Sequence, residues 1–100
     1  MTKEQLLPEQ VLKALPQLGA TSQQKNPLVL VKFFYPDYHW TWYGIEFDGY
    51  DTFFGLVEGF EKELGYFTLS ELLRNRGMLG QEIERDFYFK PTPLKELLKK

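Results

Sequence analysis

The sequence predicts one α+β domain, in which an antiparallel meander sheet of four to five strands packs with N-terminal, middle and C-terminal helices. The length favours one domain, because 100 residues is an ordinary domain size. The first strand-like segments are separated by short turns, which join antiparallel strands. Fourteen of the seventeen aromatic residues fall within 33–67, so this stretch should build most of the core.

The first 27 residues are expected to form a helix and a loop. Apolar side chains recur at the spacing of one helical face, at Leu7, Val11 and Leu15. Pro8 suits a first helical turn and Pro16 ends the run, so the helix is placed within residues 1–18. Residues 19–27 are mostly polar, which is typical of a loop.

Five segments have the composition or the alternation of strands. They are 28–35, 40–48, 52–58 and 83–89, with a short segment at 66–68. The first is almost entirely apolar, which favours a strand covered on both sides. In the second, the odd positions Tyr43, Ile45 and Phe47 are apolar, so these three side chains should share one face.

Two further helices are predicted from the residues at their ends. Residues 68–71 read Thr-Leu-Ser-Glu, the form of a capping box, and Gly77 stands where that helix would end. Thr92 as N-cap and Pro93 at the first helical position should start a C-terminal helix. The buried stripe of this last helix should consist of Leu94, Leu97 and Leu98.

The composition disfavours several classes of function. The formal net charge is −2, so no basic excess drives binding to DNA, RNA or an anionic membrane. There is no cysteine, hence no disulfide, thiolate nucleophile or thiolate metal site. The first residues lack a signal-peptide pattern, and no apolar run is long enough to span a bilayer. We therefore expect a soluble cytoplasmic protein without a cofactor.

No residue is predicted to be catalytic or to bind a metal. A catalytic imidazole needs an orienting partner and a nucleophile, and the sequence places neither beside His39, the one histidine. We therefore interpret His39 as a polar residue in a turn between two strands. Asp48 and Asp51 flank a turn, but a calcium loop needs more acids at fixed spacings.

The candidate interaction surface is aromatic and centred on two tryptophans. Trp40 and Trp42 are two residues apart, so both should lie on one face of their strand. If the opposite face meets the helices, the indoles form an exposed patch, which marks a partner or ligand surface. The alternative is that a helix or the N-terminal segment covers them. The candidate surface consists of Tyr35, Asp37, Tyr38, His39, Trp40, Trp42, Tyr50 and Asp51.

Short motifs along the chain resemble those of a known family. They are Lys32-Phe33-Phe34, Pro36-Asp37, Trp40-Thr41-Trp42-Tyr43, Glu46-Phe47-Asp48, Phe53-Phe54-Gly55-Leu56-Val57, Glu63-Leu64-Gly65-Tyr66-Phe67 and Ile83-Glu84-Arg85-Asp86. Through them, residues 28–98 resemble an uncharacterised bacterial family, domain of unknown function 2958. The resemblance implies a small single-domain protein carried on a plasmid, phage or other mobile element. It implies no activity, cofactor or catalytic residue.

Three functions are compatible with these observations. The first is a non-enzymatic interaction module that binds a protein partner, or a second copy of itself, through the tryptophan face. The second is single-strand nucleic-acid binding by aromatic stacking, which the acidic balance disfavours. Its phosphate contacts would be Lys32, Arg74, Arg76, Arg85 and Lys90. The third is an enzyme that uses Asp37, His39, Asp48 and Asp51.

Overall fold

The computed structural model describes residues 1–99 and has the predicted α+β architecture. Its helices are α1 (Lys3–Leu6), α2 (Glu9–Ala14), α3 (Leu69–Arg74) and α4 (Leu94–Leu98). Its strands are β1 (Leu28–Val29), β2 (Val31–Phe34), β3 (Thr41–Phe47), β4 (Thr52–Glu58), β5 (Lys62–Thr68), β6 (Glu84–Arg85) and β7 (Thr92–Pro93). None of the helices within residues 1–99 is long and apolar enough to cross a membrane.

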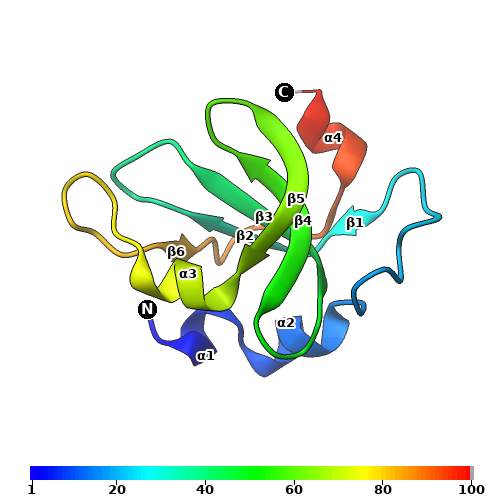
Figure 1. The fold of residues 1–100 in the computed structure, drawn as a ribbon, viewed down its shortest axis with the longest axis horizontal. Helices are drawn as coiled ribbons and strands as arrows, with labels where there is room; N and C mark the ends of the chain where they lie inside the picture. The colour runs from blue at the N-terminus through cyan, green and yellow to red at the C-terminus, as the bar shows by residue number, and fades with distance from the viewer. Residues whose placement is uncertain (100) are drawn as a thin grey trace.

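Five of the strands form one strongly curved antiparallel sheet (Figure 1). Their order is β5-β4-β3-β2-β6, so neighbours in sequence from β2 to β5 are also neighbours in space. This confirms the predicted meander. The remaining two strands, β1 and β7, pair with each other in a separate two-stranded sheet.

Strand β3 contains a β-bulge, after which its odd and even positions exchange faces of the sheet. Gly44 lies opposite Gly55 and Glu46 lies opposite Phe54, which leaves Ile45 as an extra residue without a partner. Phe47 therefore points to the same side as Trp42, and the prediction that Phe47 shares a face with Tyr43 and Ile45 is wrong. Strict alternation fails here because a bulge shifts the side-chain period by one.

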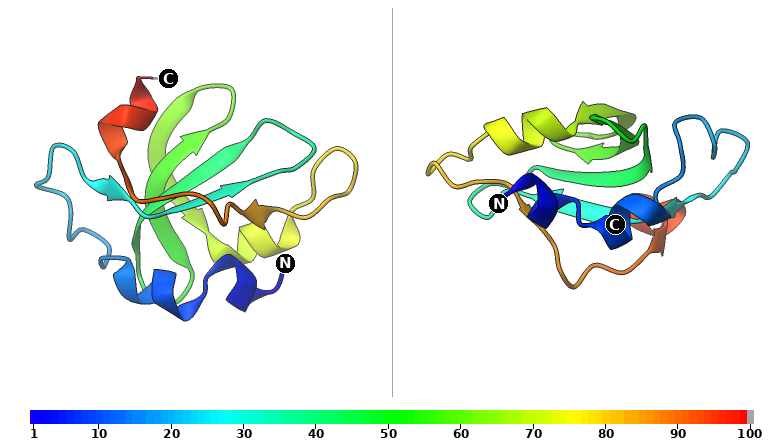
Figure 2. Two further views of the ribbon diagram at one scale, coloured as in Figure 1. Left: turned by 180° about the vertical axis from the view of Figure 1, so that it is seen from behind. Right: turned by 90° about the horizontal axis from the view of Figure 1, so that it is seen from below.

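Side chains pack against both faces of the sheet, in two separate cores. The large core joins rings from the strands to leucines of the N-terminal segment and of α3, among them Leu6, Leu7, Leu15, Phe33, Trp42, Phe47, Phe53, Phe67, Leu69 and Leu72. The small core joins the other face to α4 through Val29, Tyr43, Ile45, Leu56, Leu94 and Leu97. Figure 2 shows α4 far from α1 and α3. The expectation that helices cover only one face is therefore wrong.

The N-terminal helix is shorter and interrupted. Leu7 has φ −136° and ψ 74°, outside the helical region, and ends α1. The following proline disfavours the helical conformation at the residue before it, and Pro8 becomes the N-cap of α2 instead of a first-turn residue. The predicted apolar stripe survives the break, because Leu7 and Leu15 are buried and Val11 packs against the same core.

Several predicted boundaries also change because of pairing between distant segments. Residues 28–35 divide into β1 and β2, which pair with β7 and β3 respectively. Thr92 and Pro93 form β7 rather than the first turn of α4, because they pair with Val29 and Leu28. The predicted strand 83–89 shrinks to β6, since a turn follows in which Asp86 accepts from the Tyr88 N–H at 2.9 Å.

The ends of α3 and the packing of α4 were predicted in part. The Thr68 hydroxyl accepts from the Glu71 N–H at 3.1 Å, so Thr68 is the expected N-cap of α3. The helix ends at Asn75 and not at Gly77. In α4, Leu94 and Leu97 are buried as predicted, whereas Leu98 is 45 % exposed.

A buried carboxylate holds the loop that precedes β1. Glu46 is 3 % exposed, and its side chain accepts hydrogen bonds from the N–H groups of Gly19 (2.7 Å) and Thr21 (2.9 Å) and from the Thr21 hydroxyl. Burial alone raises the pKa of Glu46, but these hydrogen bonds outweigh it and lower the pKa below its ordinary value of 4.5. The charged form is therefore the one that the fold stabilises.

This arrangement predicts a pH-dependent contribution to stability. Because the pKa of Glu46 is lower in the folded chain, its stabilisation is complete above the unfolded pKa and is lost as the pH falls through the folded value. At neutral pH, Glu46→Gln should lower the free energy of unfolding by about 1–3 kcal/mol. Urea unfolding from about pH 7 to pH 3 should show this difference shrinking below about pH 4.5.

The control for this measurement is Glu61→Gln, at an exposed carboxylate in the β4–β5 turn. Its free energy of unfolding should follow that of the unmodified chain at every pH. A difference between the unmodified chain and Glu46→Gln that stays constant down to acid pH would contradict the role given to Glu46.

Candidate functional site

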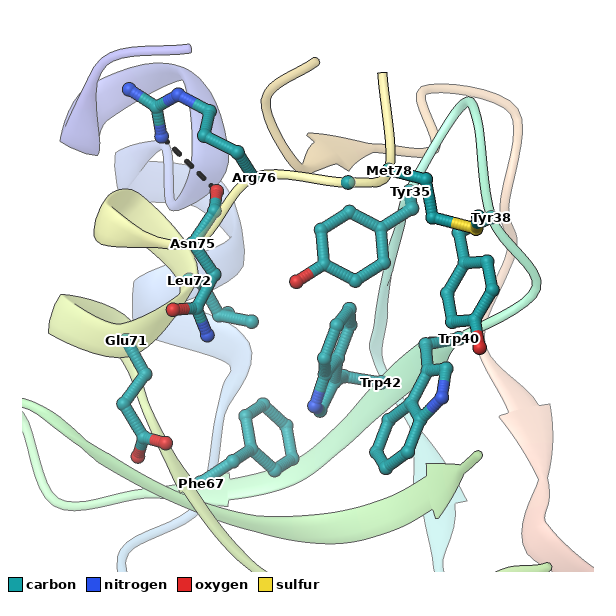
Figure 3. Close-up of a pocket in the computed structure, with 11 residues that line it drawn as sticks. Tyr35, Tyr38, Trp40, Trp42, Phe67, Glu71, Leu72, Asn75, Arg76 and Met78 are labelled. Atoms are coloured by element: carbon teal, nitrogen blue, oxygen red, sulfur yellow. Dashed lines mark hydrogen bonds between the residues drawn. The ribbon is translucent and has the colours of Figure 1, made fainter. Parts of the chain in front are cut away.

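The structure gathers four of the predicted surface residues, Tyr35, Tyr38, Trp40 and Trp42, around one cavity of about 530 Å³ (Figure 3). We call this cavity the aromatic cleft. Its remaining lining residues are Phe67, Glu71, Leu72, Asn75, Arg76, Gly77 and Met78. The volume is within the usual range of pockets that hold small molecules or single side chains of a partner.

Two segments that are distant in sequence form the walls of the cleft. The hairpin from β2 to β3 supplies the four rings: Tyr35 follows β2, Tyr38 lies in the turn, Trp40 directly precedes β3 and Trp42 lies near its start. The second half of α3 and the residues after it supply the opposite wall (Figure 3). Leu72 anchors this wall, because its side chain is 2 % exposed in the large core.

The rings contact one another in a continuous series. The edge of Tyr35 meets Trp42 with ring centroids 5.2 Å apart, and Trp40 and Trp42 are 6.1 Å apart. Trp40 also packs over Gly59, where a Cβ atom would lie 2.6 Å from the indole, and against Phe60 at 5.8 Å. Aromatic pairs at these separations stabilise one another, so the rings form a preorganised surface.

The two tryptophans differ in exposure, so the two possibilities given for this face apply to different residues. Trp42 is 8 % exposed and belongs to the large core, whereas Trp40 is half-buried. The alternative, that other segments cover this face, therefore holds for Trp42. The reason is that α3 and the N-terminal leucines pack on the same side of the sheet as its indole.

Trp42 also carries a polar group that is not used within the fold. Its indole Nε1–H makes no hydrogen bond with any residue in 1–99, and Figure 3 shows this nitrogen at the edge of the cleft. The hydroxyl of Tyr35, also without a partner in the described chain, points across the cleft toward Asn75 (Figure 3). Neither the Trp42 N–H nor the Tyr35 O–H is fully buried, so the cleft offers two donors that a ligand can reach.

The Tyr35 hydroxyl remains protonated at neutral pH. Burial, and after it the negative charge of Asp37, raise the pKa of Tyr35 above its ordinary value of 10.0. The group is therefore available as a hydrogen-bond donor in the cleft.

Asp37 connects the two walls of the cleft. Its Oδ2 accepts from the Leu79 N–H at 2.7 Å, a contact between residues 42 positions apart in sequence. A Cβ atom at Gly77 would lie 1.7 Å from Asp37 Oδ1, so only glycine lets the carboxylate come this close. The other oxygen, Oδ1, is buried and has no hydrogen-bond donor among residues 1–99. Asp37 is thus a structural residue at the back of the site.

The charged groups beside the cleft are already engaged. Arg76 lies 3.5 Å from Glu82 and donates to the carbonyl oxygens of Leu73, Arg74 and Asn75, which ends α3. Glu71 accepts from the Thr68 hydroxyl at 2.8 Å. The cleft therefore presents rings and uncharged donors rather than a free cation.

The other predicted phosphate contacts do not converge on the cleft. Lys32 lies 3.8 Å from Asp86 and over the ring of Tyr43, on the other face of the sheet. Arg85 donates to the carbonyl of Gln5 at 2.8 Å and lies over the ring of Phe87. Arg74 and Lys90 are exposed. These cations do not form one track for a nucleic-acid backbone.

The proposed cluster of Asp37, His39, Asp48 and Asp51 does not assemble. His39 is exposed between Tyr38 and Phe60 before β3 begins, and the other two acids follow its end. The seven residues of β3 correspond to a separation of roughly 20 Å. Within residues 1–99, no group of His, Asp and Glu side chains is arranged to hold a metal ion.

The two acids at the far end of β3 have structural roles. Asp48 Oδ1 accepts from the N–H groups of Asp51, Tyr50 and Thr52, which lowers the pKa of Asp48. Asp51 accepts from the N–H and the hydroxyl of Ser70, both at 2.8 Å, and so fixes the start of α3. Tyr50 is 84 % exposed beside them. The candidate surface is therefore divided between the two ends of β3.

The comparisons with known proteins agree with the resemblance noted in the sequence. No curated protein and no solved structure matches the chain. A family of proteins of unknown function, DUF2958, matches residues 5–99. The match begins before residue 28, so it includes the end of α1 and all of α2, which the motifs alone did not cover. The chain belongs to the DUF2958 family.

Proposed function

We propose that the chain is a non-enzymatic interaction module whose aromatic cleft binds a short extended segment of a partner protein. One observation supports this above the others: Trp42 is 8 % exposed, but its indole N–H is accessible at the cleft and has no acceptor within residues 1–99. A backbone carbonyl of a bound peptide would supply that acceptor. An extended peptide suits the site because its carbonyl oxygens are not used in internal hydrogen bonds.

The rest of the cleft fits the same ligand. Apolar side chains of the segment would lie against Trp40 and Met78, which is 75 % exposed at the rim. The Tyr35 hydroxyl and the Asn75 amide would bind further main-chain groups. Buried aromatic side chains are the usual anchors of protein interfaces, and Tyr and Trp supply both area and a polar group.

A selection experiment tests this proposal. A phage-displayed library of random peptides is selected on the unmodified protein and counter-selected on Trp42→Phe, which keeps a ring but removes the N–H. Peptides that depend on Trp42 should be enriched. In calorimetric titrations, an enriched peptide should bind Trp42→Phe about 10- to 100-fold more weakly, the effect of about 1–3 kcal/mol for an unsatisfied buried polar group.

The matched control is Tyr50→Phe, since Tyr50 is an exposed aromatic residue at the other end of β3. Its affinity for the peptide should be unchanged, and thermal unfolding should show that both variants are folded. Failure to enrich any peptide over the Trp42→Phe background would refute the proposal. Binding of a single-stranded oligonucleotide that weakens steeply with salt would favour the nucleic-acid alternative instead.

The cellular context is a separate part of the proposal. We infer that the chain is an accessory protein of a bacterial plasmid, phage or other mobile element and acts in the cytoplasm. The first point is what the resemblance to this family implies. Sequencing the DNA around the gene tests it: transfer, replication or integration genes are expected nearby, and conserved housekeeping genes on both sides would contradict it. Cell fractionation tests the compartment.

A further inference from the structure

Strand β5 forms a long, open edge of the sheet. It has seven residues, pairs with β4 on one side and is the last strand of the sheet on the other (Figure 1). The opposite edge, β6, has only two residues. Folded proteins usually shorten or cover such edges, because unpaired backbone groups can pair with another chain. Here one edge is short and the other is not.

The side chains at this edge are suited to burial. Leu64 and Tyr66 lie on the same side of β5 and are 50 % and 70 % exposed. Tyr66 packs against Phe54 at a tilt, with ring centroids 5.3 Å apart. The charged residues of β5, Lys62 and Glu63, are confined to its first two positions. The middle of the edge therefore lacks the charges that commonly prevent pairing between chains.

The sequence of β5 is compatible with pairing to a second copy of itself. Opposed residues in an antiparallel pair point to one face, so a two-fold axis between two β5 strands must pass midway between the two copies of one residue. Gly65 is the midpoint of Lys62–Thr68, and an axis there pairs all seven positions. Leu64 then lies opposite the second copy's Tyr66, an apolar pair that occurs twice. No two like charges are opposed.

The space at the axis and the charges of β5 favour this register. A Cβ atom placed on Gly65 would meet nothing within 4 Å, so the face of β5 at the axis is not covered by other residues. Parallel pairing in register would instead place Lys62 opposite Lys62 and Glu63 opposite Glu63, which repels. The antiparallel register avoids both repulsions.

We propose that the protein forms a symmetric dimer by antiparallel pairing of the two β5 strands about Gly65. The two five-stranded sheets then become one ten-stranded sheet. The apolar contact is made by Leu64 and Tyr66, which do not line the aromatic cleft, although Phe67 of the same strand does. The dimer therefore does not depend on the proposed peptide binding. The paired edge is short, so we expect a dissociation constant on the order of 10–100 µM.

Sedimentation equilibrium tests the dimer directly. At concentrations above this dissociation constant the unmodified chain should have twice the monomer mass of 11.9 kDa and should dissociate on dilution. The double variant Leu64→Lys, Tyr66→Lys places lysines opposite each other and should remain monomeric. The control, Tyr50→Lys with Phe87→Lys, changes two exposed rings elsewhere and should still dimerise.

A disulfide tests the register, and the chain has no cysteine of its own. In the double variant Leu64→Cys, Tyr66→Cys, position 64 lies opposite position 66 of the second copy, with Cα atoms about 4.5–5.5 Å apart. Disulfides tolerate this distance. Within one chain the Cβ atoms of the two positions point to the same face and lie about 6.6 Å apart. A disulfide needs Cβ atoms about 3.5–4.5 Å apart, so the two cysteines of one chain cannot bridge. Mild oxidation should therefore give a covalent dimer, and Tyr50→Cys with Phe87→Cys should not.

A chain that stays monomeric at every concentration and gives no covalent dimer on oxidation would overturn the proposal. A dimer that persists in the Leu64→Lys, Tyr66→Lys variant would also overturn it. Pairing of β5 with a strand of another protein would also overturn it, and would appear as a monomeric chain in isolation.

Discussion

Phe53→Ala should lower the free energy of unfolding by about 3–5 kcal/mol, the largest loss of stability expected from a single truncation in this chain. Phe53 is fully buried at the centre of the large core. Its ring contacts Phe47 at 4.4 Å, Phe67 at 5.0 Å and Phe33 at 5.6 Å, so it joins the rings of β2, β3 and β5 from its position in β4. Truncation leaves a cavity that these neighbours only partly fill.

Urea and thermal unfolding measure this effect. For a domain of about this size, a loss of 3–5 kcal/mol corresponds to a fall in the melting temperature of roughly 15 °C or more. The matched control is Phe60→Ala, because Phe60 has the same side chain but is 82 % exposed in the β4–β5 turn. A loss below about 1 kcal/mol for Phe53→Ala would show that the large core is not organised around this ring.

Gly55→Ala should destabilise the sheet by about 3 kcal/mol or more, although it adds only one methyl group. A Cβ atom at this position would lie 1.8 Å from the Tyr43 carbonyl oxygen and 2.9 Å from its carbon. These are backbone atoms of the neighbouring strand, beside the bulge in β3, and cannot rotate away as a side chain could. Relief requires β3 and β4 to separate, which breaks their pairing.

The control for this substitution is the paired glycine on the next strand. Gly65 lies directly opposite Gly55 in the register of β4 and β5, yet a Cβ atom there would contact nothing within 4 Å. Gly65→Ala should leave stability unchanged or raise it by roughly 0.5–1 kcal/mol, because alanine restricts the unfolded chain. Equal effects of the two substitutions on urea unfolding would contradict the close approach of β3 and β4.

The features that the sequence predicted well are those that local residues determine. The strands 40–48 and 52–58 were placed within one residue because apolar and aromatic runs alternate with strong turn signals. The N-cap at Thr68 was also correct, since a capping residue acts on the next turn of its own helix. The meander followed from the short turns between these strands.

The features that it missed depend on contacts between distant residues. Thr92 and Pro93 have the composition of a helix start, but pairing with β1 makes them a strand. β5 was expected only at 66–68, because a charged segment and a glycine precede it, and an edge strand tolerates both.

One wall of the aromatic cleft was predicted and the other was not. The four rings are close in sequence, so their grouping could be anticipated. The opposite wall was missed because α3 reaches the hairpin through the large core and through the contact of Asp37 with residues 77–79. Tyr50 and Asp51 were assigned to the same surface because they are near in sequence, but the length of β3 separates them from it.

The bulge in β3 has a consequence for the evolution of the family. Ile45 is the additional residue, so deleting it would restore simple alternation and leave Trp42 and Phe47 on the side of the sheet where they now lie. We therefore expect relatives that lack one residue at this point to keep the same division of side chains between the two cores. In an alignment of the family, a gap of one residue at this position should therefore be preferred to an alignment that moves an aromatic side chain from one core to the other.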